Sequence, residues 1–84
     1  MNETELKKVI LNTLGQVAPG ADMDSLDPDE NVREALDIDS FDHLNFLVGL
    51  HERLGVDIPE KDYGKLNTVN EILQYLAARK VIAA

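Results

Sequence analysis

Apolar residues recur at helical spacing in the first segment of the chain, from about Glu3 to Val17. Asn2 and Glu5 stand at its start in the spacing of a capping box, which satisfies backbone N–H groups at a helix N-terminus. The apolar positions, three or four residues apart, are Leu6, Val9, Ile10, Leu14 and Val17. The pattern predicts an amphipathic helix that is ended by Ala18-Pro19-Gly20.

A second helix is expected from about Ser40 to Leu54, with Asp39 or Ser40 as its N-cap and Gly55 as its C-terminal stop. Phe46 and Leu50 lie beside its apolar stripe, and two interpretations stay open for them. They form an exposed contact patch, or they are partly buried against the turn that follows the helix. The stripe itself is predicted to face the core, and it consists of Phe41, Leu44, Leu47, Val48 and Leu54.

A last helix opens with a second capping box, formed by Thr68 and Glu71. The helix is expected to end near Lys80, where basic residues complement the negative end of the helix dipole. Its apolar positions at helical spacing are Val69, Ile72, Leu73 and Leu76.

Two segments connect these helices. The first is a long loop in which Leu26, Val32 and Leu36 are predicted to point inward. The second contains Glu60 to Lys65, which is expected to supply one helical turn with Tyr63 packed on the core. No segment shows sustained two-residue alternation, so the fold class is predicted to be all-α. We expect a small three- to four-helix bundle with a long loop between the first and second helices, and one domain over residues 1–84.

The formal net charge of -8 resides in one stretch of the chain. Residues 22–42 contain nine acids against a single base, Arg33, while the remaining acids and bases balance at seven each. This stretch ends around Ser40, and it can attract a basic partner over a Debye length of about 8 Å at physiological salt. Long ordered loops are more often functional than accidental.

Composition excludes several classes of function. Nucleic-acid binding is not expected, because phosphate contacts require more Lys and Arg than this acidic chain offers. The absence of cysteine excludes disulfides and thiolate metal sites. The pairs Asp22-x-Asp24 and Asp37-x-Asp39 lack the glycine and the closing glutamate of an EF-hand, so no dedicated metal site is expected. No apolar run approaches the roughly 20 residues that span a bilayer, and we expect a monomer in the cytoplasm without membrane insertion.

Ser40 is the main candidate for covalent chemistry, because it stands where the acidic loop turns into the second helix. Taken alone, a serine at such a position is most simply an N-cap. A nucleophile pair of Ser40 and His43 is not expected, because a hydrolase also needs an orienting third group, an oxyanion hole and a pocket that excludes water. We therefore expect His43 to be solvated.

The sequence around Ser40 combines several motifs in a fixed order. Asp39-Ser40-Phe41 is followed by the apolar helix, by Gly55-Val56-Asp57-Ile58-Pro59 and by Asn67-Thr68-Val69. In this combination the chain resembles the acyl carrier protein family, and the resemblance runs from about Leu26 to Leu76.

The resemblance implies a carrier and not an enzyme, so no catalytic residue is expected. In that family the serine of the Asp-Ser pair, here Ser40, carries 4′-phosphopantetheine, which a separate magnesium-dependent phosphopantetheinyl transferase takes from coenzyme A. The thiol of this arm holds an acyl or polyketide intermediate as a thioester, as in fatty acid biosynthesis and lipid metabolism. Asp39 would help the transferase to recognise the site, and the competing interpretation is that Asp39 only caps the helix.

Three positions depart from the family pattern: Asp37 stands where Gly is usual, Phe41 replaces the usual Leu, and Asn45 stands where many fatty-acid carriers have Glu. We interpret them as signs of a specialised carrier. The resemblance implies that acyl-loading and acyl-processing enzymes with basic docking surfaces would bind a surface made of Asp37, Phe41, Asp42, Asn45, Phe46, Glu52 and Asp57. The alternative function is an unmodified protein-interaction domain that keeps the carrier fold and binds a partner through its acidic surface.

Overall fold

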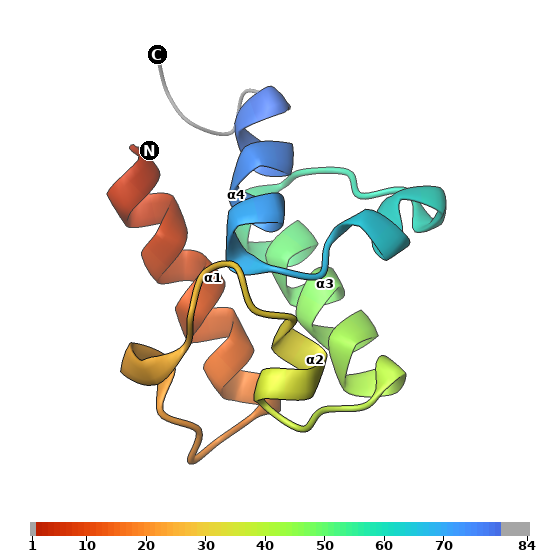
Figure 1. The fold of residues 1–84 in the computed structure, drawn as a ribbon. Coiled ribbons are helices and arrows are strands. Elements are labelled where there is room, and N and C mark those ends of the chain that lie inside the picture. The colour runs from red at the N-terminus through yellow and green to blue at the C-terminus, as the bar shows by residue number, and fades with distance from the viewer. Residues whose placement is uncertain (1, 80–84) are drawn as a thin grey trace.

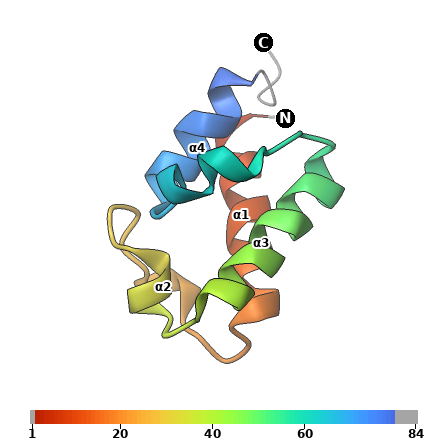
Figure 2. The ribbon, with the colours of Figure 1, turned by 90° about the vertical axis from the view of Figure 1, so that its right-hand side faces the viewer.

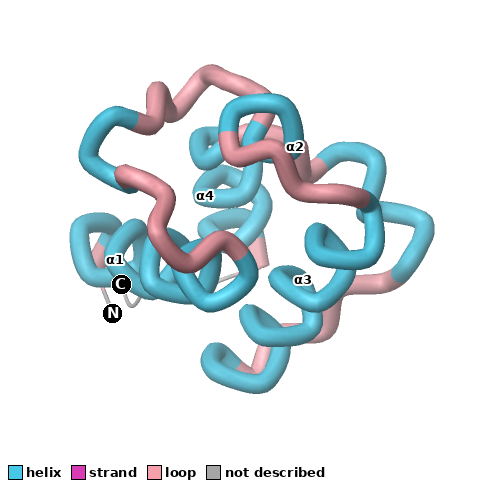
Figure 3. Tube along the Cα trace, turned by 90° about the horizontal axis from the view of Figure 1, so that it is seen from below, coloured by secondary structure: helices cyan, strands magenta, loops and turns pink. Residues whose placement is uncertain are grey.

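The part of the chain that the computed structural model describes, residues 2–79, folds into four α-helices and two short 3-10 helices. The α-helices are α1 (Glu3–Val17), α2 (Val32–Ala35), α3 (Ser40–Leu54) and α4 (Val69–Ala78). The 3-10 helices are η1 (Met23–Ser25), which precedes α2, and η2 (Glu60–Lys65), which lies between α3 and α4. Helix α1 packs against both α3 and α4 (Figures 1 and 2). The predicted all-α class is confirmed, and Figure 3 shows only helices and loops in the described range.

The N-terminal end of α1 forms as its capping pattern predicts. The Oδ1 atom of Asn2 accepts a hydrogen bond from the backbone N–H of Glu5 at 2.8 Å, which satisfies one donor of the first turn. Leu6, Ile10 and Leu14 are fully buried, so the helix turns its predicted apolar stripe to the core. The bounds of the helix agree with the prediction.

One apolar core holds the helices together. It draws on every α-helix and on the segments around η2, because an amphipathic helix gains most of its stability by burying its apolar face. Its buried members are Leu6, Ile10, Leu14, Val32, Phe46, Leu47, Leu50, Val56, Ile58, Leu66, Val69, Ile72, Leu73 and Leu76.

Helix α3 has the predicted bounds but buries a different face. Phe41 is 68% exposed, Leu44 38% and Val48 41%, although all three were expected in the core. The side chains that α3 does bury are His43, Phe46, Leu47 and Leu50. The predicted stripe was therefore wrong for three of its members, and the expectation of a solvated His43 was wrong as well.

The polar character of His43 explains this error. Positions 43, 46, 47 and 50 form a complete helical stripe, but a histidine within it makes the stripe look less apolar than its neighbour. In the fold, Nε2 of His43 lies 2.9 Å from the carbonyl oxygen of Leu66, in the link between η2 and α4. A buried polar group costs little when it is hydrogen-bonded, so His43 can face the core.

The acidic loop between α1 and α3 is more ordered than its sequence indicates. It contains η1 and α2, which were not predicted, and the side chain of Asn31 caps α2 by accepting hydrogen bonds from two backbone N–H groups. The loop is fixed to the start of α4, because Val32 donates to the carbonyl oxygen of Asn67 at 2.8 Å and Asn70 donates to that of Pro28 at 3.0 Å. Val32 is fully buried, as predicted.

The segment after α3 is anchored at both ends. Gly55 ends α3 in the left-handed conformation with φ 64°, which glycine adopts without steric cost. Val56 and Ile58 are buried, η2 supplies the expected turn, and Tyr63 packs against the core.

Buried Asp62 ties η2 to α4. The hydroxyl of Tyr75 donates to its carboxylate at 2.6 Å, Arg79 donates at 2.9 Å, and the Lys65 ammonium lies at 3.5 Å. The guanidinium of Arg79 also stacks on the Tyr75 ring, 4.3 Å from its centroid. Burial and the bond to Asp62 raise the pKa of Tyr75.

Helix α4 begins at its predicted cap, because Thr68 Oγ1 accepts a hydrogen bond from the N–H of Glu71 at 3.0 Å. The predicted end near Lys80 lies outside the described residues.

Helices α1 and α3 lie close together at Gly49, where an added Cβ would lie 2.9 Å from Thr13 Cγ2. We predict that Gly49→Ala lowers the free energy of unfolding by about 1 to 3 kcal/mol, as overpacked cores do. Gly15→Ala is the matched control, because its Cβ would meet nothing within 4 Å, and it should raise stability by about 0.5 to 1 kcal/mol. Urea unfolding of both variants checks this prediction. If Gly49→Ala were as stable as Gly15→Ala, the close approach of the two helices at Gly49 would be contradicted.

The pKa of Asp62 lies below its ordinary value, chiefly because Tyr75 donates a hydrogen bond to the carboxylate; burial opposes this effect and the charge of Lys65 adds to it. A carboxyl with a lowered folded-state pKa adds stability above its unfolded pKa, and this stability is lost as the pH falls through the folded value. Wild type should therefore exceed Asp62→Asn in stability at pH 7. This difference in the free energy of unfolding should begin to narrow below about pH 4, near the unfolded pKa of a carboxyl, and it should vanish as the pH falls through the folded value. A gap that does not change with pH in urea unfolding would refute this role of the charge.

Candidate functional site

The N-terminal end of α3 presents Ser40 at the surface. This end lies away from the start of α1 and the end of α4 (Figure 1). Asp39 is the N-cap, and its Oδ1 atom accepts a hydrogen bond from the N–H of Asp42 at 2.8 Å. Ser40 is the first residue of the helix and is exposed. The prediction left the cap open between Asp39 and Ser40, and the structure assigns it to Asp39.

The hydroxyl of Ser40 is available for chemistry because capping does not use it. Within residues 2–79, Ser40 Oγ makes no hydrogen bond, and no described residue accepts from the N–H groups of Ser40 and Phe41. Such N–H groups at a helix N-terminus favour an anion, and the positive end of the helix dipole adds to this preference. The site therefore fits a phosphodiester on Ser40 Oγ.

A sharp turn delivers the chain into α3. Asp37 has φ 53°, the only positive φ of a non-glycine residue within the described range. Aspartate tolerates this left-handed conformation better than most residues, because its short side chain bonds locally. The N–H of Ile38 donates to the carbonyl oxygen of Arg33 at 3.0 Å, and Ile38 is buried, so the turn is anchored directly before Asp39.

A surface hollow adjoins Ser40. It has a volume of about 520 Å³, and Ser40, Phe41 and Leu44 line it from α3 while Glu60 and Tyr63 line it from η2. Two exposed apolar side chains of α3 thus stand beside the serine. Together with Val48 further along the helix, Phe41 and Leu44 form an exposed apolar strip, which we call the α3 ridge.

The residues predicted to contact partners occupy different environments. Phe46 and Leu50 are fully buried in the core, so of the two interpretations left open for them the exposed contact patch was wrong, and with it the assignment of Phe46 to a partner surface. The α3 ridge replaces them, and Leu44 and Val48 were not predicted as contact residues because the apolar pattern placed both in the core. The other predicted positions reach the surface; all but half-buried Asp42 are exposed, and they are Asp37, Phe41, Asn45, Glu52 and Asp57.

His43 does not act as a general base for Ser40. Its Nε2 atom bonds the carbonyl oxygen of Leu66, and the side chain is buried. A carbonyl oxygen only accepts, so Nε2 carries the proton in this bond and cannot act as a base through that atom.

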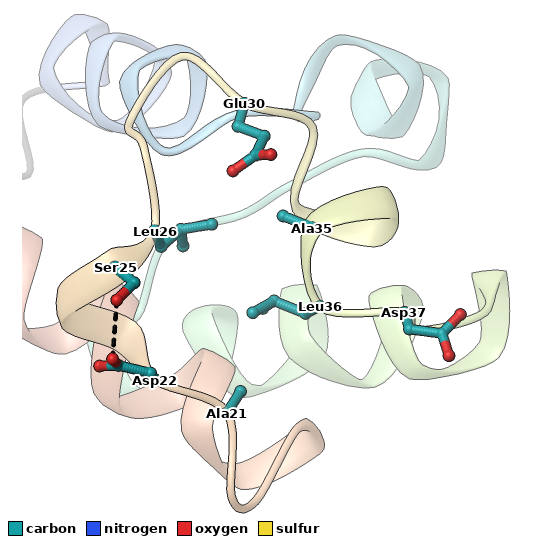
Figure 4. A pocket seen from close by; sticks show the side chains of 8 residues that line it. All are labelled: Ala21, Asp22, Ser25, Leu26, Glu30, Ala35, Leu36 and Asp37. Carbon is teal, nitrogen blue, oxygen red and sulfur yellow. Dashed lines mark hydrogen bonds between the residues drawn. The ribbon is translucent and has the colours of Figure 1, made fainter.

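The acidic loop encloses a second hollow of about 330 Å³ (Figure 4). Ser25 Oγ donates to Asp22 Oδ2 at 2.7 Å, and this bond is the main cause that lowers the pKa of Asp22. Figure 4 shows that the carboxylate of Asp37 is turned away from Glu30 and Asp22. Across residues 2–79, no group of three or more His, Asp or Glu side chains could hold a metal ion. Nor is any helix of this range long and apolar enough to cross a membrane.

Comparisons with known proteins agree with these features. The family described as "Phosphopantetheine attachment site" matches residues 6–76. An acyl carrier protein of Syntrophobacter fumaroxidans (strain DSM 10017 / MPOB) is 32% identical over 78 residues, which cover 93% of this chain and 90% of the relative. One of Thermosynechococcus vestitus (strain NIES-2133 / IAM M-273 / BP-1) is 32% identical over 77 residues, with 90% and 93% covered. One of Lactobacillus johnsonii (strain CNCM I-12250 / La1 / NCC 533) is 34% identical over 59 residues, with 70% and 74% covered.

Proposed function

The chain belongs to the acyl carrier protein family, and on this premise we propose that Ser40 carries the 4′-phosphopantetheine group and presents acyl cargo to partner enzymes. The observation that carries the proposal is the exposed hydroxyl of Ser40. It stands unbonded, among residues 2–79, at the first position of α3, directly after the cap Asp39. The bound group supplies a thiol, which this cysteine-free chain lacks, and hence a thioester link for the cargo.

Ser40 Oγ is the atom that would be modified. It forms a bond to the phosphorus of the phosphopantetheine part of coenzyme A, the pyrophosphate bond breaks, and adenosine 3′,5′-bisphosphate leaves. A phosphopantetheinyl transferase takes up the serine proton and supplies the magnesium. The N–H groups of Ser40 and Phe41 then face a negatively charged phosphodiester, which they and the helix dipole stabilise.

The surroundings of Ser40 suit docking to a basic partner. Asp39 precedes the serine and holds the first turn of α3 in place, and we propose that the transferase recognises it. The α3 ridge offers an apolar centre, with Asp37, Asp42, Asn45, Glu52 and Asp57 as its polar surroundings. Charge attraction of this kind gives fast association with modest affinity, which suits a carrier that visits several enzymes in turn.

The described helices act as one unit in this proposal, because α1 packs on both α3 and α4 and one core joins them. We propose a single carrier domain over residues 1–84 that binds its cargo covalently and leaves catalysis to its partners.

The first test is loading. Incubation with coenzyme A, magnesium and a broad-specificity transferase should add one phosphopantetheine to the wild type, as measured by intact mass. Ser40→Ala should gain nothing. Ser25→Ala is the matched control, because Ser25 is the other serine of the chain, and this variant should load like the wild type.

Ser40→Ala should fold normally. Since Asp39 and not Ser40 caps α3, its free energy of unfolding should stay within about 0.5 kcal/mol of wild type, as for other surface substitutions. If a folded wild type gains no mass while a known carrier is modified in parallel, the unmodified interaction domain becomes the better explanation.

The second test is salt dependence. The KM of the carrier in the loading reaction should rise severalfold between about 50 and 300 mM salt, because screening weakens its attraction to a basic surface of the transferase. Asp37→Asn removes one charge three residues before Ser40 and keeps a side chain that tolerates positive φ, so it should reduce this rise. Glu3→Gln removes the same charge at the first residue of α1, and the start of α1 lies away from the start of α3 (Figure 1), so this variant should leave the rise unchanged. A KM that does not respond to salt would rule out electrostatic docking.

A further inference from the structure

The hollow in the acidic loop is a second feature of the surface, apart from the α3 ridge. This loop hollow has a volume of about 330 Å³, which is within the range of ligand-binding pockets. All of its lining residues come from the connection between α1 and α3, and none belongs to α3 itself. They are Ala21, Asp22, Ser25, Leu26, Glu30, Ala35, Leu36 and Asp37.

Half of these lining residues are apolar. Figure 4 shows Leu26, which follows η1, and Leu36, which follows α2, reaching into the hollow from opposite sides. Both leucines pack against the core but are only half-buried, and Ala35 beside them is exposed. Covering such apolar walls releases water from them, so the loop hollow favours an aliphatic occupant.

One carboxylate stands unpaired at the edge of this apolar space. Glu30 is exposed and extends over the hollow in Figure 4, and no cation pairs with its carboxylate among residues 2–79. The carboxylate of Asp22 is instead engaged by Ser25 Oγ at 2.7 Å, and that of Asp37 is turned away. Arg33, the single base of residues 22–42, does not line the hollow. The charge of Glu30 is therefore left for a cation from outside.

The loop hollow is held in shape by backbone hydrogen bonds. The N–H of Glu30 donates to the carbonyl oxygen of Asp27 at 3.0 Å, and that of Leu36 donates to the carbonyl oxygen of Val32 at 3.0 Å. Val32 in turn donates to the carbonyl oxygen of Asn67 at 2.8 Å, which ties this part of the loop to the start of α4. A site that is formed in advance loses little free energy to ordering when it binds.

An arginine side chain has the chemistry that fits the loop hollow. Its aliphatic stem packs on apolar walls while its guanidinium stays at the hydrated edge, as long basic side chains do on other surfaces. The planar guanidinium forms a bidentate pair with a carboxylate such as that of Glu30, and it is less strongly hydrated than the ammonium of lysine. Arginine is also among the residues that contribute most of the binding energy at protein interfaces.

We infer that the loop hollow binds an arginine side chain of a partner protein. The stem of the arginine lies between Leu26 and Leu36, and its guanidinium pairs with Glu30. Asp37, at the edge of the hollow, precedes Ser40 by three residues, so their Cα atoms are at most about 11 Å apart. A partner that reaches Ser40 therefore meets the loop hollow as well, and a second point of contact fixes its orientation. The inference goes beyond the proposed function, because the hollow is present whether or not Ser40 is loaded.

The probe for the test is Nα-acetyl-argininamide, which has the side chain of arginine and the neutral backbone of a residue within a protein. It is titrated into isotope-labelled, unloaded wild type at constant ionic strength, and the amide signals are followed by NMR. The signals of Leu26, Ala35 and Leu36 should move and saturate, with a Kd of roughly 10 mM or tighter for a ligand of this size. Nα-acetyl-citrullinamide lacks the charge and guanidinium chloride lacks the stem, so neither should saturate over the same range.

Variants separate the charge of the hollow from its space. Glu30→Gln keeps the size of the side chain and should weaken binding of the probe by roughly three- to fivefold. Glu34→Gln is the matched control, because it removes the same charge from the same loop at a residue that does not line the hollow, and it should bind like the wild type. Ala35→Leu fills the hollow from an exposed position and should abolish saturable binding.

Three results would overturn the inference. The first is no saturation up to about 100 mM probe, ten times the expected Kd. The second is movement of signals spread evenly over residues 22–42, with guanidinium chloride as effective as the probe, because this indicates charge attraction without a site. The third is tighter binding of free arginine than of the probe, which would indicate a small-molecule site instead of a protein contact. Ser40→Ala should bind the probe like the wild type, so failure of the carrier to load leaves this inference standing.

Discussion

The face that α3 buries determines where everything else lies. Phe46, Leu47 and Leu50 pack into the one core, and His43 joins them because its ring bonds the carbonyl oxygen of Leu66. With this face fixed, the helical period of 3.6 residues leaves Ser40 and the α3 ridge outside. The attachment point and the apolar contact surface are thus consequences of the same packing, and rotation of α3 about its axis would bury one while exposing the core.

The acidic residues of the chain are held in place by this packing but do not determine it. Nine acids lie in residues 22–42, the stretch of chain that ends around Ser40, and the loop that carries most of them is fixed to the start of α4 by backbone bonds to Asn67 and Asn70. Order in the loop gives these negative charges fixed positions on the surface. None of these nine carboxylates takes part in an ion pair within residues 2–79, so their field is directed to partners.

Local signals in the sequence located the helix ends well. The caps at Asn2 and Thr68 and the stop at Gly55 each depend on neighbours in the chain, so residue type and spacing suffice to predict them. The prediction of the buried face of α3 failed because that face depends on Leu66, which lies 23 residues from His43 in sequence. Helix α2 was missed because four residues are too few for a periodicity, although Asn31 before Val32 was a usable capping signal. Ser40 was found through its motif, but only the fold distinguishes it from the cap at Asp39.

On the function proposed here, Ser40 bears 4′-phosphopantetheine in the working protein. Tandem mass spectrometry of the protein isolated from its own cells tests it most directly, because it reads the modification and its position together. We expect that the peptide containing Ser40 carries the group, releases a pantetheine fragment on collisional activation, and has its phosphate on the serine. A native protein that is unmodified at Ser40, or modified at another residue, would contradict it.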